Sequence, residues 1–261
     1  MYKEKEFNNF DVVQLKILSN SLSEFLIECD RDLLKEKNNP KLKLLLQTGP
    51  PWASWYEMPY PVFIDIFFEV MGLKEVLVQA SQAEDPGQML IDHQIGMDDP
   101  TDEEIEMYDL DDQAIITSLT FASINNLKYF QLEGISLNDL LEKANDSESA
   151  LLQAITFDKT IVSTSTAKNK IQLAEFQGNT KFRKKLAKAI SKERTQLDLE
   201  LNDTRFVHFI LEECMSGKKI SMRQRYELFT DDLKVFFGDE QTFKKFIDRT
   251  NIRRKRTLNQ V

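Results

Sequence analysis

Residue types that commonly carry catalysis are scarce in this chain. Its only histidines are His93 and His208, and its only cysteines are Cys29 and Cys214. Glu212 follows His208 by one helical turn, a spacing that permits proton transfer but that helices also show routinely on their surfaces. Two histidines and two cysteines are too few for a multi-histidine metal site or a zinc ribbon. We therefore expect a non-enzymatic protein with no catalytic residue, no bound metal and no cofactor.

Motifs for binding phosphate or metal are equally weak. Gly217-Lys218-Lys219 lacks the earlier glycine and the final Ser or Thr of a P-loop, and the chain has no GxGxxG. Residues 84–112 hold 12 acids and no Lys or Arg. Carboxylates bind Mg²⁺ and Ca²⁺, but the spacing matches no EF-hand, so we favour a solvated acidic loop whose like charges repel. A metal-dependent hydrolase centred on 92–112 is the third functional hypothesis.

Charge divides the chain into two unlike halves. Residues 1–150 carry 11 Lys or Arg against 29 Asp or Glu, a net charge of −18, whereas residues 151–261 carry 23 against 14, a net charge of +9. Such asymmetry is typical of a protein whose basic half meets nucleic acid or an acidic partner. The leading hypothesis is therefore a protein that binds nucleic acid through its C-terminal half.

Three blocks, 178–195, 217–225 and 244–256, carry most of the positive charge of that half. Each Lys or Arg that meets a phosphate releases condensed counterions, which favours binding. Lys is also a good helix former on solvated faces, and the C-terminal basic tail can instead dock on the acidic segment 98–112. The residues that we expect to contact nucleic acid are Lys181, Arg183, Lys184, Lys185, Lys188, Lys218, Lys219, Arg253, Arg254, Lys255 and Arg256.

The first basic block has the pattern of an amphipathic helix. Its apolar residues lie at i, i+4, i+7 and i+8 and predict a core stripe of Phe182, Leu186, Ala189 and Ile190. Ala174 and Gly178 have helix-turn-helix spacing, but Lys184 falls where that motif buries an apolar residue. We favour a simple αα-hairpin, in which Gly178 ends one helix and Asn179 or Thr180 caps the next.

An aromatic, proline-rich segment at 48–61 offers a second kind of surface. Trp and Tyr dominate the hot spots of protein interfaces, so Trp52, Trp55 and Tyr56 are candidate partner-binding residues. These rings can equally pack onto the core, which is the interpretation that we favour. A protein–protein adaptor, or a subunit of a larger assembly, is the alternative functional hypothesis.

Helical periodicity predominates elsewhere, so the elements that position these residues are expected to be helices. We predict an all-α fold, an irregular array of about ten helices with an acidic central loop, including a helix within 11–37 and a mostly buried one at 62–70. The chain divides into an acidic region at 1–112 and a basic region at 113–261, or forms one continuous domain. It shows no secretory signal and no apolar stretch long enough to span a bilayer, so we expect a cytoplasmic protein without membrane contact.

Overall fold

The all-α prediction is confirmed. The computed structural model describes residues 39–85, 88–89, 92–93, 109–192, 199–214, 221–232, 235 and 237–258, and these contain eleven α-helices and no strand. The helix expected within 11–37 and most of the acidic segment lie outside these residues. No helix of the described residues is long and apolar enough to cross a membrane.

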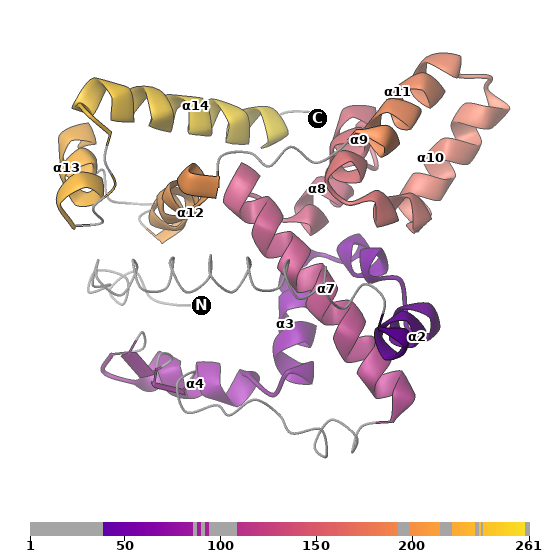
Figure 1. Ribbon diagram of the computed structural model, residues 1–261, viewed down its shortest axis with the longest axis horizontal. Coiled ribbons are helices and arrows are strands. Elements are labelled where there is room, and N and C mark those ends of the chain that lie inside the picture. Colours follow the sequence, from indigo (N-terminus) through magenta and orange to yellow (C-terminus); the bar gives the residue numbers. More distant parts are fainter. Residues whose placement is uncertain are drawn as a thin grey trace.

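Helix α7 (Leu110–Glu133) runs through the middle of the molecule, and the other helices are arranged around it (Figure 1). It begins at Leu110, within the segment 84–112 that the sequence analysis expects to be an acidic loop. The Asp109 side chain accepts a hydrogen bond from the amide of Asp112 at 2.8 Å and so caps the helix. Asp111 and Asp112 lie in the first turn, where the helix dipole favours negative charge. The end of the acidic segment therefore belongs to a helix.

The segment before the acidic residues packs beside α7. It comprises α2 (Pro40–Thr48), the 3₁₀ helix η2 (Trp52–Glu57), α3 (Tyr60–Val70) and α4 (Lys74–Gln82). The expectation that 62–70 forms a mostly buried helix is wrong, because Phe63 alone is buried in α3 and Val62 is 48% exposed. Helix α3 contacts η2, α4 and α7, and it still leaves Val62 and Val70 exposed.

After α7, the chain builds a helical group that ends in the first basic block. Its elements follow in the order α8 (Leu137–Lys143), α9 (Glu148–Phe157), the 3₁₀ helix η3 (Lys159–Ser163), α10 (Ser165–Phe176) and α11 (Thr180–Ser191). One hydrophobic cluster joins this group to η2, α3 and α7, with Tyr56, Phe63, Leu119, Leu151 and Phe182 among its buried residues. The cluster thus contains residues from both sides of position 112. The division of the chain into two regions at that position stays a prediction.

A second hydrophobic cluster lies among the last helices, α12 (Leu199–Cys214), α13 (Met222–Glu227) and α14 (Glu240–Leu258). Phe243 of α14 lies at its centre and contacts the rings of Phe229 and Phe237. Outside both clusters, Phe130 of α7 packs edge-on against Phe209 of α12, with ring centroids 6.0 Å apart, and so connects α12 to α7.

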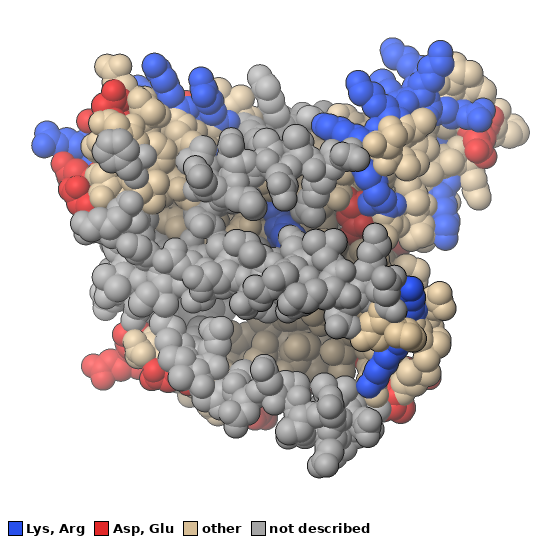
Figure 2. Space-filling view, in the orientation of Figure 1, with Lys and Arg blue, Asp and Glu red and all other residues tan. Residues whose placement is uncertain are grey.

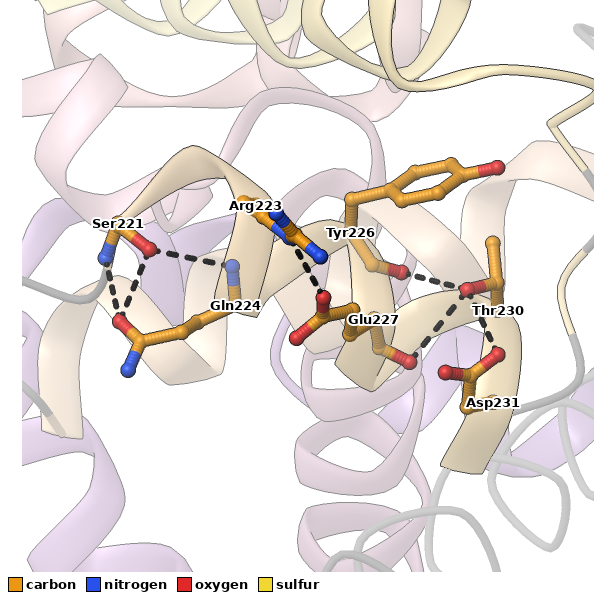
Figure 3. Close-up of polar contacts among 7 residues, drawn as sticks. All are labelled: Ser221, Arg223, Gln224, Tyr226, Glu227, Thr230 and Asp231. Carbon is orange, nitrogen blue, oxygen red and sulfur yellow. Dashed lines mark hydrogen bonds and ion pairs between the residues drawn. The ribbon is translucent and has the colours of Figure 1, made fainter.

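Local polar contacts define α13 and the π-helical turn that follows it, η4 (Leu228–Asp232) (Figure 3). Ser221 and Gln224 form a capping box, in which the Ser221 hydroxyl accepts from the Gln224 amide at 3.2 Å. Arg223 pairs with Glu227 one turn along the exposed face. The Thr230 hydroxyl donates to the carbonyl of Tyr226 at 2.9 Å, which occupies a backbone acceptor where the helix widens. These contacts are local to α13 and η4 and hold the two turns together.

A buried pair of asparagines connects α7 to α8 and η2. The Asn126 amide donates to the Asn138 side-chain oxygen at 2.9 Å and accepts from the amide of Leu137 at 2.7 Å. The Asn138 amide group donates to the carbonyls of Trp55 and Met58, both at 2.8 Å. Each of these groups would cost free energy if it were buried without a partner, so the pair fixes one relative position of the three elements.

We expect Asn138→Ala to lower the free energy of unfolding by about 2–4 kcal/mol, because it leaves the Asn126 amide and two backbone carbonyls without their partners. The control is Asn169→Ala, at an exposed site on α10, which should change it by less than about 0.5 kcal/mol. Urea unfolding followed by circular dichroism measures both. Equal effects of the two substitutions would show that the pair is unimportant.

Candidate nucleic-acid interface

Helices α10 and α11 form the αα-hairpin that the sequence predicts. Gly178 has a φ of +62°, the left-handed conformation that glycine adopts without strain, and it ends α10. The amide of Asn179 donates back to the carbonyl of Ala174 at 2.8 Å. The Asn179 side chain then caps α11 by accepting from the amide of Phe182 at 3.0 Å. The hairpin projects from the body of the molecule (Figure 1).

The packing of the hairpin differs from that of a helix-turn-helix. Lys184 is exposed, although its position in that motif is buried. Phe182 and Ala189 are buried as the predicted stripe requires, and Leu186 is half-buried. Ile190 departs from the prediction and is 45% exposed, because it lies beyond the edge of the contact between α11 and the core.

Lysines cover the outer face of α11. Lys181, Lys184, Lys185 and Lys188 lie at i, i+3, i+4 and i+7, the spacing of one helix face, and all four are exposed. Arg183 is also exposed but faces another direction around the helix. None of these cations forms an ion pair with any residue that the structure describes.

The hairpin as a whole is strongly basic. Residues 165–192 contain eight Lys or Arg and a single acid, Glu175, a net charge of +7. Figure 2 shows Lys and Arg side chains gathered over α10 and α11, with a separate group over α13 and α14 at the other end of the same edge. The geometry therefore concentrates positive charge on α11 rather than spreading it evenly.

The buried carboxylate of Asp158 connects η2, α7 and η3 next to the hairpin. One of its oxygens, Oδ2, accepts from Trp52 Nε1 at 2.9 Å, Tyr56 Oη at 3.0 Å and Asn125 Nδ2 at 3.2 Å. The other oxygen accepts from the amide and hydroxyl of Thr160 at 2.9 and 2.7 Å, which caps η3. These five hydrogen bonds offset the free-energy cost of removing a charged carboxylate from water.

Lys159, the next residue, connects the same junction to the end of α11. Its ammonium donates to the carbonyl of Ala189 at 2.5 Å and to that of Thr156 at 3.1 Å. A cation at this position satisfies an unpaired carbonyl of the last helical turn and is favoured by the helix dipole. Desolvation lowers the pKa of Lys159, and the nearby charge of Lys192 lowers it further. Both ends of α11 are thus fixed, one by Asn179 and one by Lys159.

The three aromatic candidates belong to the core contacts of η2. Tyr56 is buried, and Trp52 and Trp55 are half-buried. Trp52 stacks on Phe121 with centroids 5.2 Å apart, and Trp55 Nε1 donates to the Ser118 hydroxyl at 2.8 Å. Their polar and apolar surfaces are therefore used mainly inside the protein, as the core interpretation expects.

The remaining candidates are divided between α14 and the residues outside the description. Lys218 and Lys219 are among the latter. The four residues Arg253, Arg254, Lys255 and Arg256 belong to α14, which continues to Leu258 rather than giving way to a tail. Lys255 is exposed, whereas the Arg254 guanidinium lies 5.5 Å from the centroid of the Phe209 ring, a cation–π distance. The side chains of Arg253 and Arg256 are not described.

The His208 and Glu212 pair is part of a buried polar network. His208 has no exposed surface, and Asn251 Oδ1 lies 2.9 Å from its Nε2. Arg225 Nη1 lies 3.0 Å from its Nδ1 and also forms an ion pair with Glu212. Arginine donates only, so Nδ1 accepts and the proton of the neutral ring is on Nε2. Burial lowers the pKa of His208, although the Asn251 hydrogen bond opposes the shift.

Sequence reasoning did not identify the roles of Asp158 and Lys159. The spacing of Asp158 and Thr160 is that of an Asx turn, a local signal that was available. Within the described residues, no three His, Cys, Asp or Glu side chains gather as a metal site requires. Asp98 and Asp99, candidates for such a site, lie outside them.

The His208 network predicts a pH-dependent stability. In the unfolded chain His208 has a pKa of about 6.5, and in the folded protein its pKa is lower. The contribution of neutral His208 to the free energy of unfolding is therefore fully present above pH 6.5 and is lost as the pH falls towards the folded pKa. Between pH 7.5 and 5.5, we expect His208 to account for a loss of at most about 1.4 kcal/mol. His208→Gln should remove this share of the pH dependence, whereas His93→Gln should retain it; urea unfolding at several pH values distinguishes these outcomes.

Comparison with protein-family models, curated proteins and solved structures gave no match for this chain. The function proposed below therefore depends on the charge and geometry of the site. Its strongest feature is the outward lysine face of α11, which is anchored at both ends of the helix.

Proposed function

We propose that this protein binds nucleic acid through the lysine face of α11, comprising Lys181, Lys184, Lys185 and Lys188. The observation that supports this function is the exposure of all four lysines on one helix face, with no ion pair to any described residue. Charges in this arrangement are available to phosphates without first breaking an ion pair to a residue that the structure describes. Binding would then gain free energy from the release of counterions.

The dimensions of the face fit a short stretch of sugar–phosphate backbone. From Lys181 to Lys188, α11 rises by about 10 Å at 1.5 Å per residue. Successive phosphates of one duplex strand are separated by about 3.4 Å along the axis, so the face is long enough for about three or four of them. Lysine ammonium groups act as point charges, and contacts to phosphate carry no sequence information. The proposed binding is therefore insensitive to base sequence.

The acidic remainder of the chain limits how strong this binding can be. With a net charge of −9, the whole protein repels a polyanion at long range, and only the local field of the hairpin attracts it. Added salt screens both effects and removes the gain from counterion release. We therefore expect moderate affinity with a steep dependence on salt.

The salt dependence of affinity tests this proposal directly. Replacing both Lys184 and Lys188 by Gln removes two phosphate contacts, so the slope of log affinity against log salt should become less negative by about 1.4 to 1.8. Fluorescence anisotropy with a labelled oligonucleotide between 50 and 200 mM salt measures this slope. The affinity at low salt should fall as well.

A matched pair of substitutions controls for net charge. Lys41 and Lys43 are exposed on α2, away from the hairpin, and the change of both to Gln removes the same two charges. This control should leave the slope close to that of the parent protein. Equal slopes for the two double variants, or no binding by the parent at 50 mM salt, would contradict the proposal.

Assembly with a protein partner is the second candidate function. The observation in its favour is the exposure of Val62 and Val70 on α3 and of Met71 directly after it. Apolar side chains that cluster on a surface are typical of protein interfaces. Val62→Glu distinguishes the two functions, since it should disrupt such an assembly and leave oligonucleotide binding unchanged.

A further inference from the structure

The apex of the α10–α11 hairpin carries an aromatic ring that the fold does not cover. Phe176, the last residue of α10, is 91% exposed, and Leu173, one turn before it, is 54% exposed. The two lie at i and i+3 and are neighbours on one side of the helix. By contrast, Ala167, Ala174, Phe182 and Ala189 of the hairpin are buried.

The turn beside this ring is open. A Cβ atom added at Gly178 would meet no atom within 4 Å apart from those of its chain neighbours, so the turn is open at this point. Lys181 lies in the first turn of α11, directly after the apex, and is exposed. Glu175 is the one acid within residues 165–192, whose net charge is +7. The ligand that complements the exposed Phe176 ring and the positive charge of the hairpin is a polyanion that also has a flat, apolar surface.

We infer that Phe176 stacks on an unpaired base of a single-stranded nucleic acid whose phosphates lie along the lysine face of α11; this inference rests on the proposed function. Every base has a π-face, so stacking on an aromatic ring is tolerant of sequence, as are the phosphate contacts of the lysines. In a duplex the base faces are already stacked on one another, and exposing one costs free energy. The apex therefore selects single strands over duplexes.

Substitution of Phe176 tests this selection in the full-length protein. We expect Phe176→Ala to weaken binding to a single-stranded 12-mer about tenfold, the effect of one stacked base, and to leave the affinity for the matching duplex unchanged. Phe176→Trp should keep the affinity, whereas Phe176→Leu should lose it, because leucine is apolar but has no π-face. A 2-aminopurine base in the single strand reports stacking by fluorescence quenching, which Phe176→Ala should abolish.

Several outcomes would overturn the inference, and they separate it from the proposed function. Equal losses on single strand and duplex, or full affinity and quenching with Phe176→Leu, reject stacking while the lysine contacts stand. If the parent protein binds no oligonucleotide at 50 mM salt, stacking and the proposed function fail together. Leu44→Ala, an apolar truncation at an exposed site on α2, is the matched control and should change neither affinity nor quenching. Thermal unfolding of each variant confirms that the comparison is between folded proteins.

Discussion

The position of the basic hairpin depends on the buried carboxylate of Asp158. Its two oxygens accept five hydrogen bonds, from Trp52, Tyr56, Asn125 and Thr160, and so join η2, α7 and η3 at one point. A buried charge is tolerated only when such partners replace water, which makes this arrangement specific. Lys159 extends the same junction to the last turn of α11. The position of α11, and with it the outward direction of its lysine face, therefore depends on the contacts of Asp158 and Lys159 at the end of the hairpin away from its apex.

Polar groups inside the protein and charged groups outside it have separate tasks. Asn126 and Asn138 are buried with their hydrogen bonds satisfied and fix how helices meet. The α11 lysines have no described ion-pair partner and leave the core contacts to Phe182 and Ala189. This division explains how a chain of net charge −9 can present a strongly basic surface. Local geometry, rather than total charge, decides which surface meets a polyanion.

Much of the fold was predictable because its signals are local. Helical periodicity, Gly178 as a stop and Asn179 as a cap correctly predicted the α10–α11 hairpin. Contacts between residues far apart in the sequence could not be predicted, because no local pattern indicates them. Asp158, for example, binds Trp52 and Tyr56, which lie more than a hundred positions away. The exposure of α3 is similar, since periodicity reveals an apolar surface but not whether another helix covers it. For the proposed site, the lysines were predicted from the sequence, and the structure adds that they are exposed; the exposure of Phe176 required the structure.

The lysine face of α11 is the surface that we propose to meet nucleic acid. Lysine acetylation in solution, read by mass spectrometry with and without a single-stranded oligonucleotide at low salt, tests it most directly. The account predicts that the oligonucleotide slows modification of Lys181, Lys184, Lys185 and Lys188, while the exposed Lys41 and Lys43 of α2 react at an unchanged rate. Protection of the α2 lysines to the same extent, or protection elsewhere with α11 unaffected, would contradict it.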